Sequence, residues 1–147
     1  MRLTVALALT LFVACSDSMD EPETMMPSAA SMERSFLQMS ARILGPAQND
    51  DDADLRIELK ETNGVSARIN LLRLTCNNGS QQQWGAGNIT AERGSNQIAG
   101  NGEVVLIRHY RCPSSGRPST LEADLVDTNG FQHRISVAPF HPDWPGA

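Results

Sequence analysis

Apolar and polar side chains alternate along most of the chain between residues 35 and 140. The clearest run is 55–60, LRIELK, in which every second residue is apolar and the others are charged. A period of two is typical of β-strands that bury one face. Further apolar runs, separated by turns rich in Gly, Pro and Asn, cover 37–43, 65–76, 104–112, 121–125 and the residues after 131.

The last two runs are joined by a turn that fixes their register. Asp127 and Phe131 flank Thr128-Asn129-Gly130, and a three-residue loop with a left-handed glycine is a common hairpin connection. Such a loop puts the apolar side chains of both strands on one face, whereas a two-residue turn would divide them. The predicted pairs are Leu125 with His133, Ala123 with Ile135, and Leu121 with Val137.

The segment 65–76 departs from strict alternation. A bulge near Asn70-Leu71 would return its later apolar residues to the inward face. The inward residues are then Ile69, Leu72, Leu74 and Cys76. Residues 77–87 are mostly polar but include Trp84, and we expect a loop there. Residues 89–92 are expected to form either one helical turn capped by Asn88 or a short strand.

About seven short strands without a long helix predict an all-β fold, a single antiparallel sandwich. Residues 55–137 resemble the immunoglobulin-like domains of bacterial envelope proteins. The turn patterns that carry this resemblance are Asn63-Gly64-Val65 leading to Ile69, Ile98-Ala99-Gly100-Asn101-Gly102 before a strand, and Asp127-Thr128-Asn129-Gly130. The resemblance implies the fold and leaves the function open, because such sandwiches serve many unrelated roles.

The first fourteen residues have the pattern of a secretory signal peptide. Met1-Arg2 supplies a positive charge, and residues 3–14, LTVALALTLFVA, are uncharged. This run is too short for a helix that crosses a bilayer core, which needs about 20 residues.

The signal ends in Phe12-Val13-Ala14-Cys15, which resembles the lipobox of bacterial lipoproteins, with Phe12 where leucine is usual. The resemblance implies cleavage before Cys15 and a diacylglycerol on its thiol, so that the protein is anchored to a membrane of the bacterial cell envelope. Ser16, rather than aspartate, follows the cysteine, which in enteric-type lipoproteins implies sorting to the outer membrane. The alternative is an ordinary secretory signal followed by a chance cysteine.

Charge divides the rest of the chain. Residues 15–54 contain nine acids and two arginines, a balance of −7, whereas residues 55–147 contain eight acids and nine bases, a balance of +1. No basic stripe of the kind that nucleic acid requires is present, so we expect no nucleic-acid partner. The predicted organisation is a signal peptide at 1–14, a lipidated, acidic, flexible and disordered tether at 15–34, the sandwich at 35–140, and a tail at 141–147.

The chain has three cysteines, Cys15, Cys76 and Cys112. If Cys15 carries the lipid, the other two are free to form a disulfide, which an exported compartment favours. The alternative is a pair of buried free thiols.

An acidic loop offers weak candidates for calcium binding. Asp50, Asp52 and Asp54 have the spacing of oxygen ligands, and Glu61 falls where the last ligand of a calcium loop would be. However, Leu55 occupies the position where a calcium loop needs glycine for its sharp turn. We therefore favour a solvated loop, and we expect no metal site and no cofactor.

Trp84 and Tyr110 are the candidate binding residues, because together they could stack against a sugar. The alternative is that Trp84 folds back over the edge of the sandwich. The histidines His109, His133 and His141 have no evident acid and nucleophile partners, and no serine lies in a G-x-S-x-G turn, so we expect no enzyme.

Three functions follow, in order of preference. The first is a membrane-anchored, non-catalytic interaction or accessory module that meets an envelope protein or a glycan through its loops. The second is a lipoprotein that binds a small ligand or a calcium ion, and the third is a hydrolase. The oligomeric state stays open.

Overall fold

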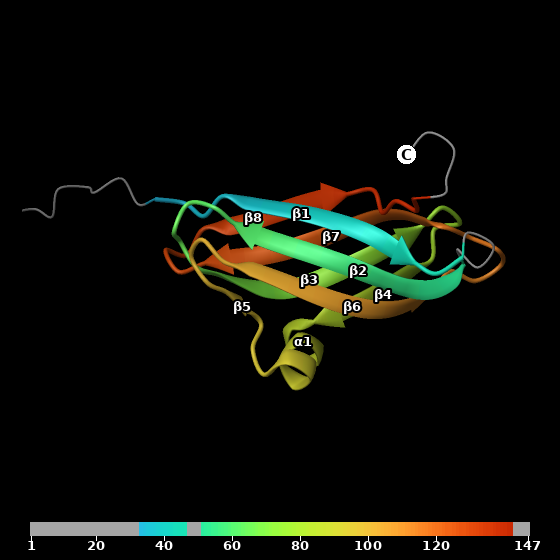
Figure 1. Cartoon of the computed structure of the whole chain (residues 1–147), viewed down its shortest axis with the longest axis horizontal. Helices are drawn as coiled ribbons and strands as arrows, with labels where there is room; N and C mark the ends of the chain where they lie inside the picture. The colour runs from blue at the N-terminus through green and yellow to red at the C-terminus, as the bar shows by residue number, and fades with distance from the viewer. Residues whose placement is uncertain (1–32, 47–50, 143–147) are drawn as a thin grey trace, which may run out of the picture. The chain divides into compact units, whose positions relative to one another are not determined.

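The alternating segments form strands, and the strands form two antiparallel sheets (Figure 1). The computed structural model describes residues 33–46 and 51–142, all within a unit formed by Ser31–Ala147. The predicted signal peptide, Cys15, the rest of the tether up to residue 32, and Asp50 lie outside the described residues. The elements are β1 (Leu37–Leu44), β2 (Asp52–Glu61), β3 (Ala67–Cys76), β4 (Gln81–Gly85), α1 (Ala86–Arg93), β5 (Gln97–Ile98), β6 (Glu103–Arg111), β7 (Pro118–Asp127) and β8 (Gln132–Val137).

The strand order is that of an immunoglobulin-type sandwich. One sheet has the order β1-β2-β6 and the other has the order β4-β3-β7-β8, with the short β5 also paired with β3. The chain leaves the first sheet after β2, returns to it for β6, and then completes the second sheet. Connections that cross between the two sheets in this way are the Greek-key connections of this class of sandwich. Within the second sheet, β4 pairs with β3. The predicted all-β sandwich is therefore confirmed.

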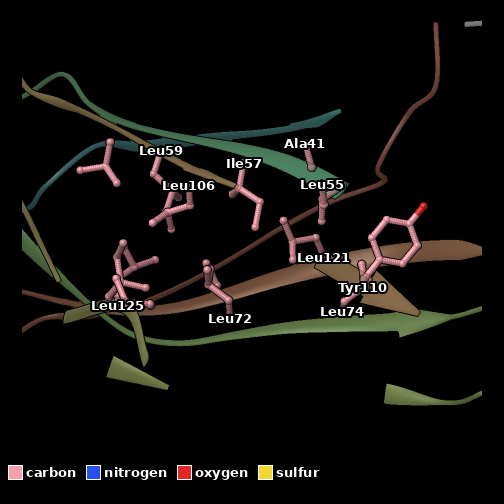
Figure 2. Packing of buried hydrophobic residues seen from close by; sticks show 14 of the residues in the cluster. Ala41, Leu55, Ile57, Leu59, Leu72, Leu74, Leu106, Tyr110, Leu121 and Leu125 are labelled. Atoms are coloured by element: carbon pink, nitrogen blue, oxygen red, sulfur yellow. The ribbon is translucent and has the colours of Figure 1, made fainter. Parts of the chain in front are cut away.

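The core lies between the two sheets, which contribute alternate side chains to it (Figure 2). In β6, for example, every second residue is buried and the others are exposed. Each fully buried aliphatic side chain contributes about 1.5–3 kcal/mol relative to an exposed one. Leu55, Ile57, Leu59, Leu72, Leu74, Leu106, Leu121 and Leu125 form the centre of this core.

Both details of register predicted from the sequence are confirmed. The three predicted pairs of the last hairpin occur in β7 and β8, and the turn closes through a 3.0 Å hydrogen bond from the amide of Asp127 to the carbonyl of Phe131. Gly130 has the left-handed φ of 86° that this turn requires. In β3 the register shifts between Ile69 and Leu71, where the bulge was expected.

The segment 77–93 differs from its prediction. Residues 81–85 form β4, an edge strand paired with β3, rather than part of a loop. The following helix, α1, has eight residues instead of one turn, and Asn88 lies inside it. The Oδ1 atom of Asn88 accepts a 3.2 Å hydrogen bond from the amide of Gly85, which precedes the helix. The glutamine-rich sequence of β4 lacks the alternation of apolar and polar residues that predicts a strand. An edge strand can lack it because most of its surface can be polar.

The domain is wider than predicted at both ends. The side-chain amides of Asn129 and Asn63 donate hydrogen bonds of 2.6 and 2.7 Å to the carbonyl oxygens of Glu33 and Arg34. At the other end, His141 is 1% exposed, and its Nε2 atom lies 2.7 Å from the carbonyl oxygen of Gly45. Glu33, Arg34 and His141 therefore belong to the folded domain rather than to the tether or the tail.

Both open sides of the sandwich are covered. Phe140 pairs with the edge of β1, where its carbonyl accepts a 2.9 Å hydrogen bond from the amide of Ile43. On the opposite side, α1 lies next to β4 and β6 (Figure 1) and buries Ile89 in the core. Its Glu92 forms an ion pair with Arg108 of β6, a buried arginine that points between the sheets. Covered edges resist pairing with other strands.

The disulfide predicted between Cys76 and Cys112 is present, with the two Cα atoms 5.9 Å apart. Cys76 ends β3 and Cys112 follows β6, so the bond joins the two sheets at one end of the sandwich. The sequence separation is 36 residues. In the chain-entropy model, closing a loop of this length stabilises the fold by about 4 kcal/mol.

Candidate functional site

The predicted stacking platform is absent. Tyr110 is fully buried in the core between the sheets, as Figure 2 shows. Trp84 lies in β4 opposite Leu72 and is half-buried against the core. Tyr110 therefore offers no surface to a ligand, and Trp84 takes the position over the edge of the sandwich that was the alternative for it.

Of the acidic residues proposed for calcium, Asp52 and Asp54 lie together at the start of β2, and Glu61 lies apart from them. Asp52 and Asp54 begin β2, where they lie 3.1 and 3.2 Å from the ring nitrogens of His109. Glu61 ends the same strand, ten residues long, and so lies far from both. Across residues 33–46 and 51–142, no group of three or more His, Cys, Asp or Glu side chains is arranged to hold a metal ion.

Glu61 instead holds loops at its end of the sandwich. Its buried carboxylate accepts hydrogen bonds from the amides of Phe36, Asn63 and Asn101, at 3.1, 2.7 and 2.8 Å. Burial alone would raise the pKa of Glu61, but these amides stabilise the charged form, and the net result is a lowered pKa. The role of Glu61 is therefore structural.

Asp127, at the same end, is a second buried carboxylate with a full set of partners. Its Oδ1 atom accepts from the amides of Asn129 and Phe131 at 3.0 and 2.9 Å, and its Oδ2 atom from the amide of Ser35 at 3.2 Å. The Nε2 atom of His133 lies 2.9 Å from Oδ2. Burial opposes ionisation, but the hydrogen bonds from His133 and the backbone outweigh it and lower the pKa of Asp127 to about 2.

Ser35, His133 and Asp127 thus meet, although no partners for His133 were expected from the sequence. The hydroxyl of Ser35 lies 3.1 Å from Nε2 of His133, the same nitrogen that faces Asp127. In a hydrolase triad, the acid and the nucleophile occupy opposite ring nitrogens, so that the histidine can pass a proton between its two sides. Here one nitrogen meets both groups, and the arrangement lacks the geometry of a proton relay. The contact between Ser35 and Asp127 could not be found from the sequence alone, because the two residues are 92 positions apart.

Most of the exposed large apolar side chains in the described part of the chain lie on the outer surface of the β1-β2-β6 sheet. Val105, Ile107 and Phe140 are 38%, 41% and 42% exposed, and they are three of the four large hydrophobic residues exposed in the described part of the chain. The fourth, Phe36, lies at the end where the chain enters the domain. We call the outward side chains of β1, β2 and β6, together with Phe140, the β1–β2–β6 face.

One row across this face contains two arginines side by side. Phe140 pairs with Arg42, Arg42 with Arg56, and Arg56 with Ile107, so the row runs from one apolar residue to another. Like charges directly opposite each other on neighbouring strands destabilise a sheet. Glu58 neutralises Arg56 at 2.7 Å, but Arg42 has no ion-pair partner among the described residues.

The row lies in a shallow hollow of about 500 Å³. Its lining residues are Ser40, Arg42, Leu44, Arg56, Glu58 and Phe140. A second hollow of about 320 Å³ continues along the same face beside Met39 and Lys60. The face therefore combines exposed apolar side chains, an arginine without an ion-pair partner (Arg42) and two shallow hollows.

Two hollows elsewhere lack this combination. One of about 570 Å³ on the other sheet is bordered by Asp124 and Arg134, which neutralise each other through hydrogen bonds of 2.5 and 3.1 Å. The other, of about 480 Å³, adjoins Ser35 and His133, which already have partners. The β1–β2–β6 face is therefore the candidate functional site.

The fold and this surface define a disulfide-bonded immunoglobulin-type sandwich with one sheet face open for contact. No helix in the described ranges has the length and apolar character of a membrane span. Several solved structures match this chain, and two of them are named here. A structural genomics target designated SoR45 is 12% identical, with 77% of this chain and 91% of that chain covered and a TM-score of 0.47.

The second, the putative ApaA protein from Bordetella pertussis, is 13% identical, with 76% and 96% covered and a TM-score of 0.45. No protein-family model matches the sequence, and no curated protein is similar to it. At these levels of similarity, neither structure bears on the function of this chain.

Proposed function

We propose that this protein is a lipid-anchored interaction module of the bacterial cell envelope, sorted to the outer membrane, and that it binds a protein partner through the β1–β2–β6 face. The observation that carries the binding role is that exposed Val105, Ile107 and Phe140 lie on one sheet face, on either side of the Arg42–Arg56 pair. Exposed apolar groups that gather on one surface mark interaction sites, whereas scattered ones need no explanation. The lipobox-like sequence around Cys15 supports the anchor.

This proposal moves the binding surface away from the loops. The sequence favoured the polar segment after Cys76, but that segment contains a paired strand, and its tryptophan packs against the core. A calcium site that includes both Asp54 and Glu61 is not supported, because these two residues lie near opposite ends of β2.

Site-specific photo-crosslinking in cells tests the binding surface. A photoreactive residue at Ile107, on the β1–β2–β6 face, should give a discrete crosslinked species. The matched control is the same residue at Val126, which lies half-buried on β7 in the other sheet. Equal crosslinking from both positions, or from neither, would refute the assignment of the face.

The anchor is tested separately. Cys15→Ala should abolish labelling with a palmitate analogue and release the protein from the membrane fraction, since stable attachment needs two or more acyl chains. Cys15→Ala protein that still labels would rule out this lipidation site.

A further inference from the structure

We infer that the hollow at Arg42 and Arg56 binds a carboxylate side chain of an acidic peptide segment that carries an apolar residue beside the acid. This inference rests on the proposed function, because it names the chemistry of the partner that the β1–β2–β6 face would meet.

The first argument is the unrelieved positive charge. Arg42 and Arg56 are direct cross-strand partners on the outer face, a placement that brings their Cβ atoms within about 5 Å of each other. Only one of the two, Arg56, has an acidic partner in the described residues. A carboxylate that contacts both guanidinium groups would supply the acidic partner that Arg42 lacks and would further reduce the repulsion between Arg42 and Arg56. The planar fork of arginine suits a carboxylate in two-point contact.

The second argument is the apolar surface beside the charge. Phe140 and Leu44 border the hollow on the β1 side, and Ile107 ends the row on the β6 side. An anion alone would leave these side chains in water. A peptide with a leucine-like residue next to its acid would cover them, and each buried methylene group adds about 0.8 kcal/mol.

The acids around the row limit the ligand to one or two negative charges. Asp54 and Glu58 flank Arg56 at two residues on either side, and so lie on the same face. A polyanion such as a nucleic acid or an acidic polysaccharide would bring further negative charges against them. Only a ligand with an isolated anionic group fits between the two acids, which favours a peptide.

Nuclear magnetic resonance of the domain from Ser31, which forms a unit by itself, tests the inference. The probe is the capped tripeptide Leu-Glu-Leu, and the matched control is Leu-Gln-Leu, which has the same shape without the charge. The Nε–Hε signals of Arg42 and Arg56 should shift saturably with the first peptide only. The affinity should fall as salt is added, because these groups are exposed to solvent.

Variants localise the effect. Arg42→Gln and Arg56→Gln should each weaken binding about tenfold, because each removes a charged hydrogen bond to the carboxylate. Lys60→Gln is the control, because it removes the same charge from the same face outside the hollow of the arginine row, and it should change the affinity less than about twofold. Backbone spectra of each variant establish that the fold is kept.

Four results would overturn the inference. They are no saturable shift, equal binding of the glutamine peptide, equal weakening by Lys60→Gln, and tighter binding of inorganic phosphate than of Leu-Glu-Leu. Crosslinking from Ile107 in the absence of peptide binding would leave the interaction module in place and refute only the chemistry of its partner.

Discussion

Replacing Asp127 with asparagine should remove a large part of the acid sensitivity of this fold. Its buried carboxylate accepts hydrogen bonds from three backbone amides and from His133, which hold its pKa at about 2 against an ordinary value of 3.8. Each pKa unit is worth 1.36 kcal/mol, so the difference corresponds to about 2 kcal/mol of stability.

The sign of the effect follows from the direction of the shift. Because the pKa of Asp127 is lower in the folded state, its contribution is complete above pH 3.8 and is lost as the pH falls through about 2. The difference in unfolding free energy between wild type and Asp127→Asn should therefore be large above about pH 5. It should shrink by about 2 kcal/mol by pH 2.

Urea unfolding of the domain from Ser31 at several pH values measures this difference. The comparison is valid if the slope of the unfolding free energy against urea concentration is the same for both proteins. Asp54→Asn is the control, because it removes the same charge from an exposed position on β2. A wild-type-minus-Asp127→Asn difference that stays constant from pH 7 to pH 2 would show that ionisation of Asp127 does not stabilise the fold.

Three other changes test the packing. Reducing the Cys76–Cys112 bond should lower the unfolding free energy by about 4 kcal/mol, measured with and without reductant, and alkylation of two thiols in the unreduced protein would contradict the bond. Trp84→Ala should cost about 2 kcal/mol in thermal or urea unfolding, since only part of the side chain is buried, and no loss would return Trp84 to the exposed surface. Arg108→Met should leave the unfolding free energy unchanged or raise it by about 1 kcal/mol. The reason is that two side-chain nitrogens of Arg108 lack partners in the described structure, whereas Glu92 keeps access to solvent. A loss of about 3 kcal/mol would show that the Arg108–Glu92 ion pair is net stabilising.

Local sequence patterns sufficed for the features that depend on neighbouring residues. The register of the last hairpin followed from one turn and the apolar period. The bulge in β3 followed from a single break in alternation, confirmed between Ile69 and Leu71. In both cases the burial of one face leaves a single register that keeps apolar side chains out of water.

Features that depend on distant partners could not be predicted in this way. Tyr110 was a candidate for binding because an aromatic residue in a strand suits a core and a binding surface equally well, and only packing against the second sheet decides between them. Ser35 could not be placed beside His133 from the sequence, because the two residues are 98 positions apart and meet only in the folded domain. The full row, from Phe140 through the two arginines to Ile107, depends on the pairing of β1, β2 and β6. The chain forms β3, β4 and β5 in the other sheet before it returns to form β6.

The treatment of charge elsewhere in the domain gives the arginine row its significance. Asp127 and Glu61 are buried and receive hydrogen bonds on both oxygens, and Arg134 and Asp124 neutralise each other on the outer surface. Arg42 is one of several exposed bases without an ion-pair partner among the described residues, but its direct cross-strand partner is a second arginine, next to Phe140 and over a hollow. Natural proteins keep such local conflicts mainly where binding or catalysis compensates for them. A bound acid would give Arg42 the partner that it lacks and reduce the repulsion between the two arginines, so this arrangement supports the proposal that the β1–β2–β6 face is a binding surface.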